Sequence, residues 1–348
     1  MAFHLLKGLT RYNDIEVSVI LLNEGRLAEE IRRMNIPAEV LDENKMSFFQ
    51  IFLTIRKILA RGFPDIIHSH RYKENILAYL VSKTKRDIKL ISTQHGMPEF
   101  YVSNSGLRHR LISRLNFFVF SRRSHSVVAV SKDIQKTFAN QYRFSEDKVK
   151  VIHNGIEIPE DIPAKKETLF VIGSSGRLFP VKDYPLMVEV SREVLKKTNN
   201  VRFELAGDGP ERIKIQDLIQ KYKLREIFFL RGFMSDISSF YKGLGIYLNT
   251  SHHEGIPMSV LEAMSYGIPI IAPKVGGFTE IIEDGVQGYL VDGRNPEDFA
   301  ERCLTLSKDE HLRIKMGLAA REKIMKEFSV DHMAKKYHDL YFDIIQNT

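Results

Sequence analysis

The sequence has a single cysteine and no apolar run long enough to cross a bilayer. Because one cysteine, Cys303, excludes an internal disulfide, the chain is typical of proteins from the reducing cytosol. No apolar segment approaches the roughly 20 residues that a transmembrane helix needs, and the N-terminus does not show the basic, apolar and small-residue segments of a secretion signal. We therefore expect a cytoplasmic protein that neither spans a membrane nor carries a secretion signal.

Recognisable metal and nucleotide motifs are also missing. No pair of His, Cys or carboxylate residues has convincing metal-ligand spacing, so we expect no metal site. The stretch GSSGRLFPVKDYP at residues 173–185 fits neither GxxxxGKS/T nor GxGxxG, which excludes the standard ATPase and dinucleotide interpretations. No known nucleic-acid-binding motif accompanies the basic charge, so we expect no nucleic-acid partner.

The length and the charge distribution indicate two different halves. At 348 residues, with 43% hydrophobic and 27% charged residues, the chain is expected to fold into two soluble domains. The net charge of +7 is uneven: residues 1–155 hold 25 Lys and Arg against 15 Asp and Glu, net +10, and the remainder holds 26 against 29, net −3. Charge alone leaves open an anionic membrane surface, a phosphorylated substrate or nucleic acid as the partner of the first half.

Short apolar runs alternate with amphipathic stretches of ten or more residues, which is the pattern of βαβ units. The predicted strands are 17–22, 65–70, 89–95, 126–131, 149–155, 168–176, 201–209, 227–233, 246–251, 268–273 and 288–292. We expect an α/β protein of two doubly wound domains with parallel sheets, residues 1–157 and residues 158–330. Two or three helices follow from about residue 309, and the last one, 331–348, is expected to pack back towards the first domain.

The segment EGIPMSVLE at residues 254–262 places two glutamates on either side of a tight turn that follows a strand. Because parallel sheets bind ligands at the carboxyl ends of their strands, both glutamates are expected to face one crevice. Glu262, one helical turn in, can reach ribose hydroxyls beside a phosphate, and Glu254 can hold the hydroxyls of a second sugar. A solvated pair of surface glutamates is the alternative interpretation.

The helix after this turn is predicted to bind a diphosphate through its N-terminus. Ser259 is expected to cap the helix, and Gly267 to end it in the left-handed conformation. The backbone N–H groups of Met258, Ser259 and Val260 then point out of the helix, where its dipole favours negative charge.

Other strand ends add charge and glycine at the same edge. Arg177 and Lys182 follow the first strand of the second half and suit a diphosphate leaving group, although two solvated cations are the alternative. AGDGPER, residues 206–212, is best interpreted as a turn that opens a helix at Pro210. KVGGFTE, residues 274–280, allows another close backbone approach. In the first half, His95 ends a strand in TQHG, where a structural role competes with a catalytic one.

These motifs resemble those of the GT-B glycosyltransferases of family 4. The segments EGIPMSVLE, GRLFPVKD, AGDGPER, IPIIAPKVGGFTEII and GYLVDGRNPEDFA carry the resemblance over most of residues 149–330. DIIHSH, STQHG and VVAVSK are similar to the family over the first half. The resemblance implies two Rossmann-like domains facing a central cleft, with the nucleotide sugar bound by the second.

The resemblance also implies a role for individual residues. Glu262 would hold the ribose, Glu254 the donor sugar, Arg177 and Lys182 the diphosphate, and His95 would face the donor sugar from the first domain. The implied donor-binding residues are Gly176, Arg177, Lys182, Gly255, Ile256, Pro257, Met258, Ser259, Val260 and Glu262.

The implied activity is a retaining, metal-independent transfer without any cofactor. The donor would be a UDP- or GDP-sugar and the acceptor a saccharide or a lipid-linked molecule of cell-surface polysaccharide or glycoconjugate synthesis. The departing diphosphate would accept the proton of the acceptor hydroxyl as it attacks on the same face, so that no protein nucleophile is required. A nucleotide-sugar epimerase of the same fold and a non-catalytic nucleotide-sugar-binding protein remain alternatives.

Two further expectations concern the first half. Members of the family open with a strand and a glycine-rich loop, whereas residues 2–9 already form a predicted helix, so we expect that the first strand and part of the acceptor site are missing. Residues 108–123, RHRLISRLNFFVFSRR, mix arginines with Leu, Ile and Phe. They are expected either to contact an anionic membrane at its inner face or to form an ordinary helix that covers the sheet.

Overall fold

A computed structural model describes residues 1–70, 72–84, 87–96, 118, 122–142, 144, 148–160 and 169–346. The chain divides into two compact units. Unit 1 comprises Met1–Gly155 and Val330–Thr348, and unit 2 comprises Ile156–Ser329. The predicted boundary was placed at residues 157 and 158. Nearly all of the predicted basic helix at 108–123 lies outside the described residues.

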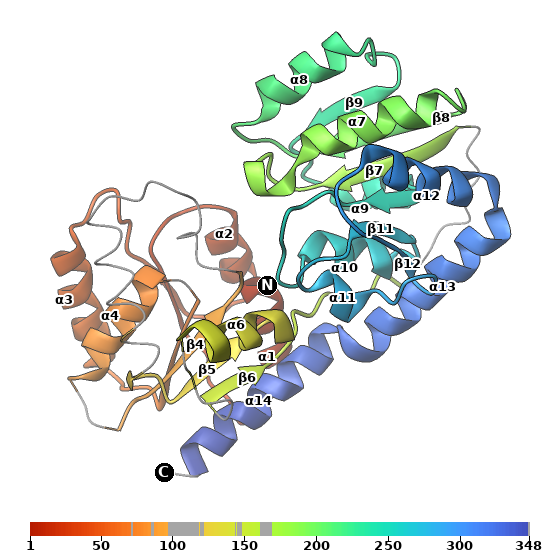
Figure 1. Ribbon diagram of the computed structural model, residues 1–348. Coiled ribbons are helices and arrows are strands. Elements are labelled where there is room, and N and C mark those ends of the chain that lie inside the picture. The colour runs from red at the N-terminus through yellow and green to blue at the C-terminus, as the bar shows by residue number, and fades with distance from the viewer. Residues whose placement is uncertain are drawn as a thin grey trace. The chain divides into compact units, whose positions relative to one another are not determined.

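Unit 2 is built on one six-stranded parallel sheet (Figure 1). Its strands lie in the order β12-β11-β10-β7-β8-β9. They are β7 (Phe170–Ser175), β8 (Val201–Ala206), β9 (Phe228–Gly232), β10 (Ile246–Leu248), β11 (Ile270–Pro273) and β12 (Gly288–Val291). Every neighbouring pair is parallel, as the alternation of strands and helices in the sequence predicts.

Helices cover both faces of this sheet. One face packs on α7 (Tyr184–Leu195), α8 (Arg212–Lys221) and α12 (Pro296–Lys308) through a core that includes Phe203 and Leu205 of β8. The other face packs on α9 (Ile237–Lys242), α10 (Met258–Ser265), α11 (Phe278–Ile281) and α13 (Glu310–Glu327) through a core that includes Val171 and Tyr247. Because these strands are buried on both faces, they appear as continuous apolar runs in the sequence.

Unit 1 contains two parallel sheets in the part that the structure describes. A four-stranded sheet has the order β3-β4-β5-β6, and a two-stranded sheet pairs β1 with β2. The strands are β1 (Val19–Leu21), β2 (Ala38–Val40), β3 (Ile66–Ser69), β4 (Lys89–Gln94), β5 (Ser126–Ala129) and β6 (Val149–Val151). All eleven predicted strands are confirmed, whereas β2 was not predicted. A strand ahead of residue 1 stays a prediction.

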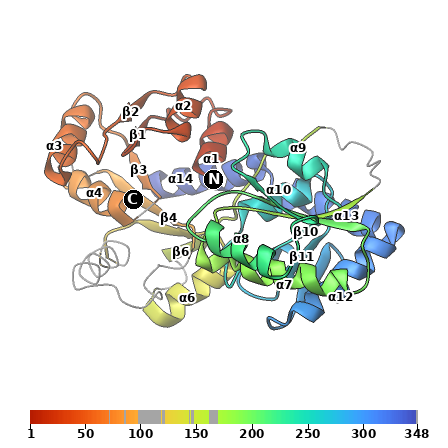
Figure 2. The ribbon, with the colours of Figure 1, turned by 90° about the horizontal axis from the view of Figure 1, so that it is seen from above.

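The helices of unit 1 include one from each end of the chain. They are α1 (Ala2–Leu9), α2 (Arg26–Arg33), α3 (Phe48–Leu59), α4 (Tyr72–Ser82), α6 (Lys132–Tyr142) and α14 (Val330–Gln346). Helices α1 and α14 lie side by side over the face of β4 and β5, where Leu5 packs with Ile91 and Tyr337 (Figure 2). The helix predicted at residues 2–9 is therefore confirmed. None of the helices that the structure describes is both long and apolar enough for a bilayer span.

Candidate functional site

The loops after β7 and β10 meet at the point where the strand order of unit 2 reverses. From β7 the chain builds β8 and β9 on one side, and it then returns to place β10 on the other side of β7. The loops at the carboxyl ends of these two central strands therefore leave in opposite directions. In open α/β sheets this arrangement creates a crevice that binds ligands. Residues 176–183 and 249–257 line this edge.

The loop after β7 approaches neighbouring backbone closely. Gly176 has φ +151°, and a Cβ there would lie 2.8 Å from Tyr184 Oη. A Cβ on Gly207 would lie 1.9 Å from the Gly176 carbonyl oxygen, and the Leu178 N–H donates to the Asp208 carbonyl at 2.9 Å. The AGDGPER segment thus acts as the predicted turn, and it supports the β7 loop. Its helix begins at Arg212 rather than at Pro210.

Arg177 and Lys182 have different surroundings within this loop. Arg177 is exposed, and its guanidinium carbon lies 4.9 Å from the centre of the Phe179 ring. Lys182 ends a short 3₁₀ helix, Pro180–Lys182, and its ammonium forms an ion pair with Glu254. No hydrogen bond or ion pair joins the Arg177 side chain to another described residue of the candidate site. Arg177 is therefore available to a ligand from solvent.

The ion pair between Lys182 and Glu254 joins two residues that were predicted to bind different parts of one donor. The Lys182 side chain is 20% exposed and that of Glu254 is 16% exposed. The Ser251 hydroxyl also donates to the same Glu254 oxygen at 2.8 Å. Because both charges are partly withdrawn from water, each compensates the other in this structure. A bound donor would have to share or replace this pairing.

Helix α10 begins two residues earlier than predicted. Pro257 is the N-cap, with extended backbone, and Met258 and Ser259 are the first two helical residues. The prediction that Ser259 caps the helix is therefore wrong, because a serine in the second helical position is past the cap. The Val260 N–H was also predicted to be free, but it donates to the Pro257 carbonyl at 3.1 Å. Gly267 ends the helix with φ +67°, as predicted.

The backbone N–H groups of Met258 and Ser259 remain without an acceptor in the described part of the chain. N–H groups in the first helical turn point away from the helix towards its N-terminal end, and the helix dipole adds partial positive charge there. Two of the three predicted N–H groups therefore fit an anion-binding role.

Glu262 is linked to the end of β7 through a buried tyrosine. Tyr241 Oη donates to Glu262 Oε2 at 2.7 Å and accepts from Ser175 Oγ at 2.9 Å. Burial raises the pKa of the Glu262 carboxyl above its usual range, although the hydrogen bond from Tyr241 opposes this shift. The same burial raises the pKa of Tyr241 well above its ordinary value, so Tyr241 keeps its proton. Glu262 is therefore oriented by a neutral donor.

The loop 274–280 holds the backbone of the turn that contains Gly255. A Cβ on Gly277 would lie 1.5 Å from the Gly255 carbonyl oxygen, and the Gly277 N–H donates to the Glu254 carbonyl at 3.0 Å. Gly276 has φ +51°, and a Cβ there would lie 2.4 Å from the Glu254 carbonyl oxygen. These close approaches show why glycine is required at both positions, and they fix the turn before α10.

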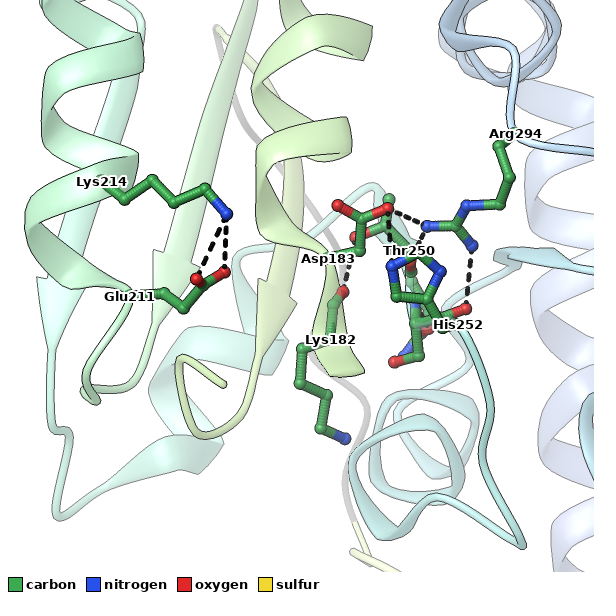
Figure 3. A network of polar contacts seen from close by, with 9 residues as sticks. Lys182, Asp183, Glu211, Lys214, Thr250, His252 and Arg294 are labelled. Carbon is green, nitrogen blue, oxygen red and sulfur yellow. Dashed lines mark hydrogen bonds and ion pairs between the residues drawn. The ribbon is translucent and has the colours of Figure 1, made fainter. Parts of the chain in front are cut away.

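Two residues to which no sequence motif assigned a role, Arg294 and Asp183, connect three strand ends (Figure 3). Arg294 forms an ion pair with Asp183 and donates to the Ser251 carbonyl at 3.0 Å. His252 Nε2 lies 3.6 Å from Asp183 Oδ2. Asp183 has φ +45° and ψ +50°, a left-handed conformation that is unfavourable for a residue other than glycine. Arg294 lies just after β12, so the rule that ligands bind at strand ends could have drawn attention to it.

Figure 3 also shows the directions in which the side chains of the loop after β7 point. The Lys182 ammonium extends away from Arg294, while the Lys182 carbonyl accepts from Thr250 Oγ1 at 3.1 Å. On α8, Lys214 Nζ donates to Glu211 Oε1 at 3.2 Å, one helical turn apart and separate from the Arg294 contacts. The Arg294 network therefore braces the backbone of the site, and Lys182 Nζ faces Glu254.

His95 belongs to a histidine cluster at the carboxyl ends of β3 and β4 in unit 1. His70 Nδ1 lies 3.1 Å from His95 Nε2, and the two rings are stacked with centres 5.4 Å apart. His68 contacts Tyr341 Oη and Thr93 Oγ1, each at 2.7 Å. Burial lowers the pKa of His68 to about 3 and lowers that of His70 well below its ordinary value. His70 is therefore a neutral partner that orients His95.

Metal ligands do not gather anywhere in the part of the chain that the structure describes. No group of three or more His, Cys, Asp or Glu residues has a suitable arrangement for a metal ion there. Besides the Asp183–Arg294 pair, the charged groups described at the strand ends of unit 2 include Arg177, the Lys182–Glu254 pair and Glu262. The two free N–H groups of Met258 and Ser259 lie between Glu254 and Glu262 in the sequence. Such a set can bind a diphosphate and neighbouring hydroxyl groups.

Both halves of the chain match glycosyltransferase family models. Residues 156–323 match the model for glycosyl transferases group 1, and residues 1–159 match the model for glycosyltransferase family 4. Together the two matches extend from the first residue to residue 323. The chain is therefore a glycosyltransferase of this group.

Individual relatives have related activities and the same fold. The chain is 28% identical over 218 residues to a poly(ribitol-phosphate) alpha-N-acetylglucosaminyltransferase of Staphylococcus aureus, over 62% of this chain and 44% of the relative. It is 23% identical to the UDP-Gal:alpha-D-GlcNAc-diphosphoundecaprenol alpha-1,3-galactosyltransferase of Escherichia coli, over 95% of this chain and 90% of the relative. The solved structure of Anabaena Alr3699/HepE in complex with UDP is similar with a TM-score of 0.83 and 22% identity, over 98% of this chain and 96% of that chain. This similarity shows that the fold is GT-B.

Proposed function

We propose that the protein is a retaining glycosyltransferase that moves a sugar from a nucleoside diphosphate sugar to a saccharide or lipid-linked acceptor. The observation that carries this proposal is the strand edge of unit 2, where two free N–H groups of α10, the Lys182–Glu254 pair and Glu262 surround the reversal point of the sheet. The names of the relatives support a UDP-sugar as donor and a product of cell-surface polysaccharide or glycoconjugate synthesis.

Each part of the donor has a partner in this proposal. The diphosphate lies at the N–H groups of Met258 and Ser259 and is neutralised by Arg177 and Lys182. Glu262, which Tyr241 orients, accepts hydrogen bonds from the ribose hydroxyls. Glu254 binds hydroxyls of the transferred sugar, while the backbone of residues 255–258 lies against that sugar. His95 of unit 1 acts on the donor sugar.

The reaction is a substitution on the same face of the sugar. The acceptor oxygen forms a bond to the anomeric carbon as the bond from that carbon to the diphosphate breaks, and the acceptor proton passes to a diphosphate oxygen. Arg177, Lys182 and the α10 N–H groups stabilise the negative charge that develops on the leaving group. With these groups in place, the reaction requires neither a metal ion nor a protein nucleophile.

Donor binding can be tested by thermal shift with UDP-, GDP- and ADP-sugars, because a ligand that binds only the folded state raises its stability. We expect a UDP-sugar to raise the unfolding temperature of the protein, Glu262→Ala to abolish this rise and Arg177→Ala to reduce it. Glu226→Ala is a matched control, since Glu226 is an exposed glutamate elsewhere in unit 2. An unchanged shift in Glu262→Ala would contradict the proposed ribose contact.

Product analysis separates transfer from the alternatives. An epimerase of this fold would convert a nucleotide sugar in the absence of an acceptor, and a binding protein would form no product with any donor and acceptor. The comparisons favour transfer, since the relatives described above are named as transferases. If lipid-linked molecules are the acceptors, the enzyme works on the inner face of the cytoplasmic membrane.

A further inference from the structure

Helix α3 of unit 1 is apolar on two opposite faces. Ile51 and Ile55 are 3% and 7% exposed and pack against α4 in a core that includes Leu77. Phe49 and Leu53, one turn apart, are 64% and 37% exposed. A helix at the surface of a soluble protein normally carries charged and polar residues on its outer face. The outer face of α3 therefore has apolar area that the fold of unit 1 does not use.

The exposed apolar residues form a stripe along the helix. Phe49, Leu53 and Arg56 follow one another at four and three positions, so they lie on one face. Phe48 is 49% exposed at the edge of the stripe. We call Phe48, Phe49, Leu53 and Arg56 the α3 outer face. Helix α3 lies at the rim of unit 1 (Figures 1 and 2), and the spacing of its residues places Phe49 and Leu53 on the opposite side of the helix from Ile51 and Ile55.

The charge around this face has one sign. Residues 44–64 contain no Asp or Glu, and their four charged residues are Lys45, which pairs with Asp42 at 3.5 Å, and Arg56, Lys57 and Arg61. Arg56, Lys57 and Arg61 form no ion pair with any residue that the structure describes. Arg56 extends over the ring of Phe52, with its guanidinium carbon 5.8 Å from the ring centre. Aromatic side chains mixed with unpaired cations are typical of helices that lie in a membrane interface.

Other occupants fit this surface less well. A second copy of the chain, packed through the same face by a two-fold axis, would bring these cations against each other. A helix-binding protein groove would suit the phenylalanines, but it would need its own acidic rim to match Arg56, Lys57 and Arg61. A bilayer that contains anionic lipid meets both requirements, because its headgroups attract the cations and its interface accepts the aromatic rings.

We propose that the α3 outer face binds the surface of a bilayer containing anionic lipid, with Phe49 and Leu53 inserted at the headgroup level and Arg56, Lys57 and Arg61 at the lipid phosphates. This surface is separate from the proposed donor site, which belongs to unit 2, and it is independent of residues 108–123. The proposal concerns where the enzyme acts and does not depend on the transfer reaction.

A single introduced tryptophan can report this insertion, because the chain contains no tryptophan. In Phe49→Trp, we expect the fluorescence maximum of the full chain to shift to shorter wavelength with vesicles of phosphatidylcholine and phosphatidylglycerol. Leu318→Trp is the matched control, since Leu318 is a 60% exposed apolar residue on α13 of unit 2. A shift in the control and none in Phe49→Trp would overturn the proposal.

Vesicle sedimentation separates the apolar and the electrostatic contributions. We expect the full chain to bind vesicles with phosphatidylglycerol at least about tenfold better than vesicles of phosphatidylcholine alone, and the binding to weaken with salt. Phe49→Ser with Leu53→Ser, and separately Arg56→Glu with Lys57→Glu, should each reduce this binding about tenfold or more. Ile314→Ser with Leu318→Ser on α13 is the control, and it should leave the binding unchanged.

Circular dichroism and the unfolding temperature confirm that the variants fold, which we expect because the replaced side chains are exposed. Equal binding to both kinds of vesicle, or wild-type binding of the α3 variants, would overturn the proposal. The proposal also fails if light scattering shows that the full chain is a dimer which the Phe49→Ser and Leu53→Ser variant dissociates. The face would then be a protein interface.

Discussion

At the scale of single residues, the ion pair between Lys182 and Glu254 should affect stability and activity differently. Lys182→Met leaves a partly buried carboxylate without its cation, which should lower the free energy of unfolding by about 2 kcal/mol. Adding Glu254→Gln removes the unpaired charge and should restore most of this loss. Transfer activity should stay lost in both variants, because each residue has its own role towards the donor.

Urea unfolding and a transfer assay on the same preparations test this pair. The expected pattern is recovery of stability in the double variant without recovery of turnover. If the double variant is as unstable as the sum of the two single variants, the ion pair makes no contribution to the fold. If it is as active as the wild-type protein, the donor contacts assigned to both residues are wrong.

We expect the buried Glu262 carboxylate to lower the stability of the ligand-free protein and to strengthen the binding of the donor. Its pKa is raised by burial, so the folded protein holds this proton more tightly than the unfolded chain does. The resulting stabilisation is fully present below the usual carboxyl pKa of 4.5 and is lost as the pH rises through the raised value. Glu262→Gln keeps an acceptor for Tyr241 and has no charge to bury. We expect the variant to be more stable than the wild-type protein at neutral pH, without ligand.

The same substitution should weaken UDP binding by about 2 kcal/mol, roughly 30-fold, because hydrogen bonds to a charged acceptor are lost. Thermal unfolding across the pH range measures the first effect, and calorimetric titration with UDP measures the second. The stability difference should disappear at acid pH. A difference of the same size at pH 4 and at pH 8 would mean that the charge of Glu262 is not its cause.

At the scale of elements, we expect that no side chain can be accommodated at position 277, where Gly277 packs against the turn before α10. The Cβ of Gly277→Ala would lie 1.5 Å from the Gly255 carbonyl oxygen, so the turn before α10 would have to move. We expect a loss of about 3 kcal/mol in unfolding free energy and a loss of donor binding, since the N–H groups of α10 would move with the turn. Gly62→Ala, where a Cβ meets nothing within 4 Å, is the control and should change neither.

The strands were more predictable than the caps and side-chain pairs. Buried parallel strands such as β7 and β11 appear as apolar runs of four to six residues, and this signal is local in the sequence. β2, Ala38–Val40, is as short as β1 but has the charged Glu39 at its centre, so it lacks the apolar run that indicated β1. The start of α10 at Met258 was misplaced because a serine two positions beyond the cap has the same composition signal as a capping serine.

The sequence predicted at which edge of the sheet the candidate site lies, but it did not predict which side chains contact one another there. Glycines, cations and glutamates after successive strands indicate the carboxyl edge of a parallel sheet, because all such ends meet there. The pairing of Lys182 with Glu254, or of Asp183 with Arg294, depends on side-chain directions of residues that are 72 and 111 positions apart. No local pattern contains this information. Likewise, three histidines at the ends of β3 and β4 gave no sign that His70 and His95 share a hydrogen bond.

At the scale of the whole molecule, unit 1 depends on a close contact between the two ends of the chain. A Cβ in Gly8→Ala would lie 2.5 Å from the Cβ of Ala334 on α14, closer than two such atoms can pack. We expect this substitution to lower the unfolding free energy by about 2 kcal/mol, and Ala334→Gly to restore part of it by making room. Urea unfolding of the two single variants and the double variant measures the coupling. Strict additivity would contradict a direct α1–α14 contact.

The division of the chain has a consequence for biosynthesis. Unit 2 is one continuous segment, Ile156–Ser329, whereas unit 1 combines the first 155 residues with the last helix. During translation the second segment to emerge can reach its final form first, while the opening segment waits for Tyr337 and Tyr341 to cover His68 and Thr93. The nascent polypeptide therefore carries an unfinished apolar surface until residues 330–346 have left the ribosome, and chaperones that hold such surfaces can protect it during this interval.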